Sequence, residues 1–162
     1  MPIRNPADLK SGLARGQRLL GLDVGTKTIG LALSDPSLTL ATPLTTLRRG
    51  KRFRDDAAAL AEVIARHAVG GLVIGLPVNM DGSEGPRAQS VRQFAANLLE
   101  RLEDPPIAFW DERLSTAAVT RTMLEADLSR KRRAELVDRA AAAFILQGFL
   151  DGLAAAARRQ RP

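Results

Sequence analysis

Residues 72–76, Leu-Val-Ile-Gly-Leu, form an uninterrupted apolar run that narrows the folds open to this chain. A strand with one wet face alternates apolar and polar residues. A continuously apolar strand is typical of a sheet that is covered on both faces. The run therefore predicts an α/β domain, with helices packed on each side of a central sheet.

The segments around this run predict the remaining elements. Strand-like segments cover residues 19–23, 28–35, 38–47 (interrupted by Pro43) and 107–111. Helical spacing of apolar residues predicts helices that begin at Asp55-Asp56, near Pro86, at Ser115 or Thr116, and at Ala134. The glycine pair Gly70-Gly71 is expected to end the first of these helices, and residues 129–133 are expected to form a basic loop. The order β-β-β-α-β-α-β-α-α predicts a mixed five-stranded sheet flanked by helices.

The length of 162 residues suits one domain. We expect residues 1–16 to be a flexible leader, residues 17–153 to be the folded domain, and residues 154–162 to be a basic tail. The chain has no cysteine, which excludes a disulfide framework and fits a reducing cytoplasm. It has no apolar run of about 20 residues, so we expect no membrane span.

The balance of charges favours a nucleic-acid partner. Lysine and arginine exceed acidic residues by a net charge of +6, and the basic residues cluster at 48–54, 130–133 and 158–161. Such clusters fit the phosphate backbone, although each alone also fits a solvated loop. Aromatic residues make up 4% of the chain, too few for a base-stacking surface. The residues expected to contact nucleic acid are Lys27, Arg48, Arg49, Lys51, Arg52, Arg113, Arg130, Lys131, Arg132 and Arg133.

Acidic residues follow two of the predicted strands and open the last helix. Asp23 ends the first strand, Asp111 and Glu112 end the fifth, and Asp138 lies in the alanine-rich helix. Strand ends of α/β sheets usually border the ligand crevice. Carboxylates from three elements can hold two Mg²⁺ ions about 3.5–4 Å apart, which assists phosphoryl displacement.

Each of these carboxylates also has a structural interpretation. Asp23 could cap its own turn, and Asp138 could serve the helix dipole. Successive strand residues face opposite ways, so one of Asp111 and Glu112 is expected to enter the site while the other pairs with Arg113 or faces a helix. We favour Glu112 for the site, because it lies nearer the strand end. For Asn79 and Asp81, turn chemistry is the favoured interpretation.

Four segments together make the chain similar to the YqgF/RuvX family. These segments are Gly21–Gly30, Gly75–Gly82, Asp111–Thr116 and Val137–Ala141. The resemblance implies an RNase H-like fold and a cytoplasmic bacterial nuclease that uses Mg²⁺ or Mn²⁺. It implies a role in maturing the 5′ end of 16S ribosomal RNA, with Holliday-junction resolution as the alternative. Asp23, Glu112 and Asp138 match the family's acidic positions, whereas the fourth strand ends in Leu76-Pro77 without an acid.

The sequence therefore predicts a metal-dependent endonuclease. Structured RNA is the favoured partner, branched DNA is possible, ribosomal precursor particles are candidate partners, and either a monomer or a homodimer fits. Residues 23–30 also resemble the phosphate hairpin of sugar kinases and actin-like ATPases, although 162 residues hold only one of their two lobes. A non-catalytic RNA-binding assembly factor is the third possibility.

Overall fold

The computed structural model describes the backbone of residues 3–114 and 130–159, and the side chains of residues 3–113 and 139–159. The helix predicted to begin at Ser115 or Thr116 lies outside the described residues. The elements of the described chain are α1 (Pro6–Ser11), β1 (Arg18–Val24), β2 (Thr28–Ser34), β3 (Ala41–Arg48), α2 (Phe53–Arg66), β4 (Val69–Leu76), α3 (Pro86–Arg101), β5 (Ile107–Asp111), the 3₁₀ turn η1 (Glu112–Leu114) and α5 (Arg130–Arg159).

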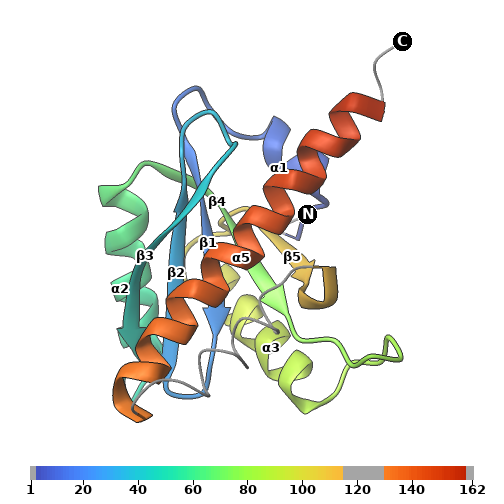
Figure 1. Cartoon of the computed structure of the whole chain (residues 1–162). Helices are drawn as coiled ribbons and strands as arrows, with labels where there is room; N and C mark the ends of the chain where they lie inside the picture. The colour runs from blue at the N-terminus through green and yellow to red at the C-terminus, as the bar shows by residue number, and fades with distance from the viewer. Residues whose placement is uncertain (1–2, 115–129, 160–162) are drawn as a thin grey trace.

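The five strands form one mixed sheet in the order β3-β2-β1-β4-β5 (Figure 1). β1, β4 and β5 run parallel to one another, while β2 is antiparallel to both β1 and β3. Four strands, β1, β3, β4 and β5, consequently end at the same edge, which we call the C-terminal edge. The predicted mixed five-stranded sheet is confirmed.

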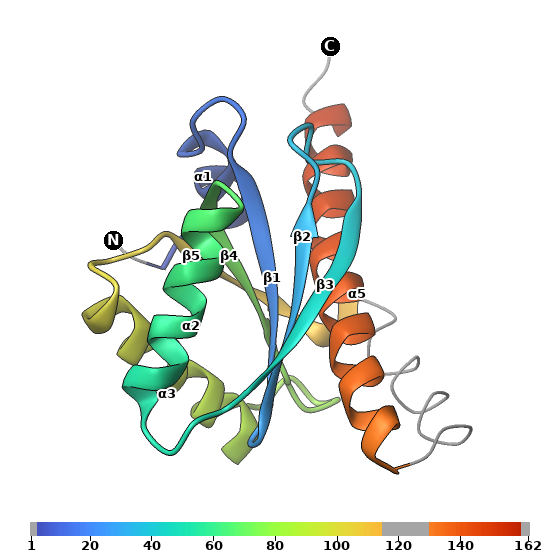
Figure 2. The ribbon, with the colours of Figure 1, turned by 90° about the vertical axis from the view of Figure 1, so that its left-hand side faces the viewer.

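Helices cover both faces of this sheet, as the apolar run in β4 predicts. Helix α5 lies on one face, and α2 and α3 lie on the other (Figure 2). In β1, Leu20 and Leu22 belong to the core under α2 and α3, whereas Leu19 belongs to the core under α5. Alternating residues of each strand therefore face different layers, and we call the two sides the α5 face and the α2/α3 face.

The glycine pair behaves differently from its prediction. Helix α2 ends at Arg66, and Gly70 and Gly71 lie inside β4 rather than stopping the helix. The chain reverses before them, at Ala68, which has a positive φ of 53°. A Cβ on Gly71 would lie 2.9 Å from Leu9 Cδ1. The glycine is therefore needed for close packing of α1 against the sheet, and that contact was not visible from local sequence.

The N-terminal segment also differs from the flexible leader that the sequence suggested. Residues 6–11 form α1, which is capped by the Asn5 side chain accepting a hydrogen bond from the Asp8 amide at 2.8 Å. Leu9 is buried to 1% exposure in the α5-side core. Ile3 forms a parallel bridge with Ile107 at the β5 edge. Burial of Leu9 thus fixes the position of residues 6–11, although Pro2 and Pro6 had suggested a flexible leader.

Helix α5 is longer than predicted at both ends. It begins at Arg130, so the backbone of residues 130–133 is helical instead of a loop, and it continues through most of the expected tail to Arg159. The alanine run 154–157 has high helix propensity, which explains the extension. Within the described chain, residues 139–159 have the length and hydropathy of a membrane-spanning helix. A buried core helix passes the same test, and Ile145, Leu146 and Phe149 of this helix are fully buried against the sheet.

Candidate active site

Asp23 lies next to the last residue of β1, with its side chain on the α5 face. Leu22 and Val24 on either side of it belong to the α2/α3-side core, so the alternation turns Asp23 the other way. Its exposed fraction is 4%. The residue opposite it on β2 is Gly30.

Glu112 brings a second carboxylate to the same place. It follows β5 as the first residue of η1 and is 6% exposed. Its Oε1 lies 2.8 Å from the position that a Cβ on Gly75 would occupy. Leu22 pairs with Ile74, so Gly75 comes beside Asp23 on strands that lie about 4.8 Å apart. We call Asp23 and Glu112 the acid patch.

Asp111, the alternative to Glu112, has a different environment. Arg113 Nη2 donates a hydrogen bond to Asp111 Oδ2 at 2.7 Å, and the Arg113 backbone amide donates to Oδ1 at 2.9 Å. These hydrogen bonds lower the pKa of Asp111 below its ordinary value. The expected pairing of one of the two acids with Arg113 is confirmed, and the acid so paired is Asp111.

Helix α5 closes over the acid patch because glycines let it approach the sheet. A Cβ on Gly21 would lie 2.8 Å from Leu146 Cβ and 3.0 Å from the Ala142 carbonyl oxygen. A Cβ on Gly75 would lie 2.4 Å from Ile145 Cδ1. Any larger residue at either position would therefore push the helix away from the carboxylates.

Asp138 lies in α5 four residues before Ala142, but its side chain is outside the described residues. Its role as a third ligand therefore stays a prediction. Among the side chains that are described, no three acidic or histidine residues form a metal-binding group. The described part of the acid patch contains two carboxylates.

The chemistry of the acid patch fits a divalent metal. A buried carboxylate is costly to ionise unless a partner compensates it, and here two of them lie side by side. Carboxylate oxygens are the hard donors that Mg²⁺ prefers, and Mg²⁺ often takes only one or two of them from a protein.

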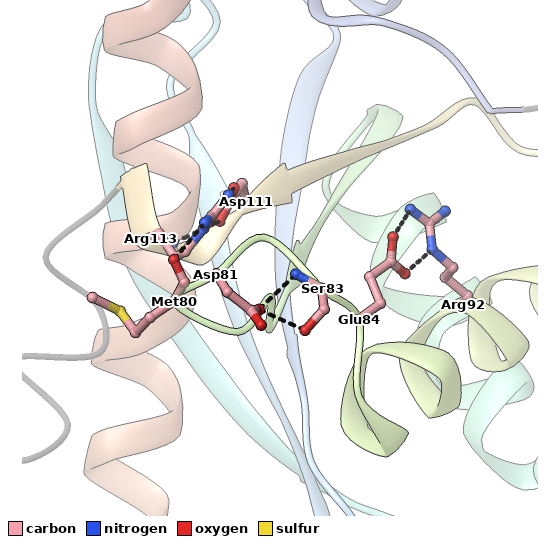
Figure 3. A network of polar contacts seen from close by, with 7 residues as sticks. All are labelled: Met80, Asp81, Ser83, Glu84, Arg92, Asp111 and Arg113. Atoms are coloured by element: carbon pink, nitrogen blue, oxygen red, sulfur yellow. Dashed lines mark hydrogen bonds and ion pairs between the residues drawn. The ribbon is translucent and has the colours of Figure 1, made fainter.

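The loop after β4 borders the acid patch and has its own hydrogen-bond network (Figure 3). Asp81 Oδ1 accepts hydrogen bonds from the Ser83 amide and hydroxyl at 2.9 and 2.6 Å, which lowers the pKa of Asp81. Arg113 Nη1 donates to the Met80 carbonyl at 3.3 Å. The expected turn chemistry of Asp81 is confirmed. Arg113, which was expected to contact nucleic acid, is held by Asp111 and this loop.

Arg49 is another predicted phosphate ligand that the structure uses internally. Its Nε donates to Asp56 Oδ2 at 3.0 Å, and its Nη1 donates to the Gly25 carbonyl at 3.0 Å. Its guanidinium lies 5.2 Å from the centre of the Phe94 ring. Asp56 is buried, and this ion pair links the β1–β2 turn to α2. We expect Arg49 to act as a structural residue, in contrast to its sequence-based prediction.

The other predicted basic residues divide into three groups. Lys27, Arg48 and Lys51 line a pocket of about 970 Å³ at the C-terminal edge. Arg52 is exposed at the start of α2, where it is the N-cap residue. Residues 130–133 are in α5, with side chains outside the described residues.

Sequence reasoning missed the glycines that shape the acid patch and the ion pair between Arg49 and Asp56. Gly21, Gly30 and Gly75 interrupt otherwise apolar strands, and glycine inside a strand often marks a close approach. The sequence therefore contained a signal for these glycines. The sequence contained no signal for the ion pair between Arg49 and Asp56, because Asp56 fits equally well as an ordinary acidic residue in the first turn of a helix.

Comparison with known proteins places this chain among nucleases. Residues 17–152 match the profile of the RuvX family, described as "Holliday junction resolvase". A protein of Paramagnetospirillum magneticum is 69% identical over 151 residues, which cover 93% of this chain and 96% of that protein. One of Rhodobacter capsulatus is 63% identical, covering 91% of each chain. Both carry the name "Putative pre-16S rRNA nuclease".

Solved structures show the same fold. The yeast mitochondrial Holliday junction resolvase Ydc2 superimposes with a TM-score of 0.54 at 11% identity, covering 93% of this chain and 84% of that one. RuvC of Thermus thermophilus gives a TM-score of 0.50 at 13% identity, covering 85% and 97%. At this level of identity the likeness concerns the fold alone, and it confirms the expected RNase H-like architecture.

Proposed function

This chain belongs to the RuvX family, and on that premise we propose that it is a divalent-metal-dependent endonuclease that processes the 5′ end of pre-16S ribosomal RNA. The names of its close relatives support the substrate, since they match over nearly the whole chain. The work would take place in the cytoplasm, on ribosomal precursor particles or on the free RNA.

The observation that carries the proposal is the acid patch. Asp23 and Glu112 are both buried, they face the same side of the sheet, and Gly75 lies between them. Buried carboxylates are costly to ionise, and a divalent metal bound by both would favour their charged forms. Nothing in the hydrophobic packing requires acids at these positions, and a metal-dependent reaction does.

In this reaction Asp23 and Glu112 would hold Mg²⁺ or Mn²⁺, with Asp138 as the third ligand. Bound there, the metal would lower the pKa of a water and stabilise the charge on the leaving oxygen. The chain itself supplies the positions of the carboxylates: β1 fixes Asp23, the β5–η1 junction fixes Glu112, and α5 shields both from bulk water. The rigid strands keep the ligands in place before substrate arrives.

Basic residues around the C-terminal edge would hold the substrate backbone. Lys27, Arg48, Lys51 and Arg52 are the described candidates, and Arg130, Lys131, Arg132 and Arg133 are candidates from sequence. If these residues bind phosphates, affinity falls with salt, with a log–log slope of about −0.7 per phosphate on single strands and −0.9 on a duplex. Binding that ignores salt would contradict this part of the proposal.

Holliday-junction resolution is the second candidate, favoured by the description of the family whose profile the chain matches. This activity requires a dimer, because symmetric cuts in a four-way junction need two active sites related by a two-fold axis. A monomer suffices for RNA processing. Oligomeric state on the substrate therefore separates the two activities.

The deciding experiment compares two substrates. The purified chain is incubated with a labelled pre-16S 5′-leader RNA and with a four-way DNA junction, in Mn²⁺ or in EDTA, beside Asp23→Asn. The proposal predicts metal-dependent cleavage of the RNA that is lost in the variant. Symmetric junction cuts without RNA cleavage would favour the resolvase, and absence of both would favour a non-catalytic RNA-binding factor.

A further inference from the structure

A basic pocket lies at the C-terminal edge of the sheet, beside the β1–β2 turn. Its walls are the β1–β2 turn, the end of β3 and the connection from β3 to α2. The residues that line it are Thr26, Lys27, Thr28, Thr46, Arg48, Arg49, Gly50, Lys51, Phe53 and Asp56. The basic pocket is lined from both faces of the sheet: Phe53, which packs edge-to-face on Phe94 of α3, comes from the α2/α3 face, whereas Thr46 pairs with Gly30 and so belongs to the α5 face. We call this set the basic pocket.

The charges of the basic pocket are unbalanced. Among the described residues that line it, four are cationic and Asp56 is the single acid. The Asp56 carboxylate is 4% exposed and accepts hydrogen bonds from Arg49 Nε at 3.0 Å and from the Gly50 amide at 2.9 Å. Its charge is therefore compensated inside the protein, by Arg49 and the Gly50 amide.

Lys27 and Lys51 are cations of the basic pocket that have no hydrogen-bond or ion-pair partner within the described parts of the chain. Both side chains are exposed. They approach from separate walls, Lys27 from the β1–β2 turn and Lys51 from the connection to α2. An anion between them would gain two charge-assisted contacts that the protein itself does not supply.

The walls of the basic pocket are fixed relative to each other before any ligand binds. The Arg49 amide donates to the Lys27 carbonyl at 2.8 Å, and Arg49 Nη1 donates to the Gly25 carbonyl at 3.0 Å. The same guanidinium pairs with Asp56 on α2. Arg49 thus joins both walls, so ligand binding would not have to order the backbone that carries the two lysines.

We propose that the basic pocket binds one non-scissile phosphate of the nucleic-acid strand that is cut at the acid patch. This inference rests on the proposed nuclease function and adds the path of the substrate. Lys27 lies four positions after Asp23 in the chain, so their Cα atoms lie at most about 14 Å apart. At 3.4 Å of axial rise per nucleotide, that span corresponds to about four nucleotides of a duplex strand.

The strand would therefore run along the C-terminal edge, with one phosphate in the basic pocket and another, a few nucleotides away, at the acid patch. A phosphate held in the pocket fixes which linkage reaches the carboxylates. The basic pocket would then set the position of the cut, whereas the acid patch performs the cut. Sequence would not need to be read through the bases.

The test is equilibrium binding of a fluorescent RNA to the full chain in EDTA, which removes cleavage from the measurement. The test variant is Lys27→Gln/Lys51→Gln. The control is Lys10→Gln/Arg15→Gln, which removes the same charge from exposed positions before β1 at the opposite end of the sheet. We expect the test variant to weaken binding at least about 10-fold near 0.1 M salt and to reduce the salt slope by about 0.7, the value for one phosphate on a single strand. Equal effects of the two variants would overturn the proposal.

Two further arms identify the source of the phosphate. RNA with a 5′-hydroxyl and RNA with a 5′-phosphate should depend equally on Lys27 and Lys51, because the proposed phosphate is internal. A dependence confined to 5′-phosphorylated RNA would contradict this and assign the pocket to a chain end. Displacement of RNA by ATP in the wild type, absent in the test variant, would also contradict it, in favour of a nucleotide site.

Cleavage-site mapping separates this inference from the proposed function. In Mn²⁺, wild type should cut within a narrow window and the test variant should cut over a wider one. If wild type binds RNA through the two lysines but cuts nothing under any condition, the nuclease proposal fails and the pocket remains a phosphate site. If wild type cuts and the test variant cuts at the same positions as the control, the pocket proposal fails alone.

Discussion

The acid patch and the basic pocket lie at the same edge of one sheet, and they are built by different means. The acid patch consists of two buried carboxylates, which glycines on neighbouring strands allow to lie under a close-packed helix. The basic pocket consists of exposed cations on loops, whose positions an internal ion pair fixes. The proposed chemistry of the acid patch depends on buried carboxylates in fixed positions. The proposed binding by the basic pocket depends on exposed positive charges.

This difference predicts two kinds of response to mutation. Groups in the acid patch act in fixed geometry at low dielectric, so that losing one should abolish the reaction. Cations in the basic pocket act through a field that salt screens, so losing one should weaken binding in proportion. Four substitutions test this difference between the two regions.

The largest effect is expected at Glu112. Replacing it with glutamine keeps the shape and removes a metal ligand, so single-turnover cleavage in Mg²⁺ should fall about 10³-fold, with RNA binding in EDTA little changed. Asp111→Asn is the matched control, because that carboxylate is held by Arg113. A loss of similar size in both variants would show that Glu112 has no special role.

Substitution of Arg49 tests whether its ion pair with the buried Asp56 stabilises the walls of the basic pocket. Arg49→Gln leaves the buried Asp56 carboxylate without its ion pair, and we expect the free energy of unfolding to drop by about 3 kcal/mol in urea titrations. The neighbouring Arg52→Gln removes an exposed charge and should change it by less than about 0.5 kcal/mol. If the double variant Arg49→Gln/Asp56→Asn is no more stable than Arg49→Gln, the ion pair is not the cause.

Gly75 tests the packing over the acid patch. An added methyl group would lie 2.4 Å from Ile145 Cδ1 and 2.8 Å from Glu112 Oε1. Gly75→Ala should therefore cost about 1–3 kcal/mol, which lowers the melting temperature by several degrees, and it should also reduce cleavage. Gly12→Ala, where the nearest atom is 3.4 Å away, provides the control. Unchanged melting would mean that α5 does not approach the sheet as closely as described.

The smallest effect concerns pH and the ion pair between Asp111 and Arg113. Hydrogen bonds from Arg113 lower the pKa of Asp111 in the folded state below its ordinary 3.8. A lowered folded-state pKa stabilises the fold fully above the unfolded value, and the contribution fades as pH falls below it. The stability difference between wild type and Asp111→Asn should be constant from pH 7 to about 5 and should shrink between pH 4 and 3. Denaturation curves at these pH values give the answer, and a difference that grows on acidification would reverse the sign.

Much of the sheet was predictable because its signals are local. Apolar runs predicted all five strands, and Pro86 predicted the start of α3. The errors occurred where a distant contact decides the structure: Leu9 orders the N-terminal segment, and its packing on Gly71 explains a glycine pair that had seemed to end a helix.

The positions of Asp23 and Glu112 were likewise readable from strand ends, and alternation allowed for Asp111 pairing with Arg113, whereas the roles of Asp23, Glu112 and Asp138 stay predictions. The basic residues were harder to assign, because charge alone does not say which arginine has a partner. Arg49 and Arg113 stand beside Arg48 and Glu112 in sequence, yet both are held by internal carboxylates. Only the three-dimensional arrangement separates these structural arginines from Lys27 and Lys51.

The central claim is that Asp23 and Glu112 bind a divalent metal on the α5 face. Paramagnetic broadening of backbone amide signals by substoichiometric Mn²⁺ tests it most directly. The account predicts broadening centred on Asp23, Gly75 and Glu112 in wild type and in Asp111→Asn, and its loss in Glu112→Gln. Broadening that is centred on the Asp81 loop, or that persists unchanged in Glu112→Gln, would contradict it.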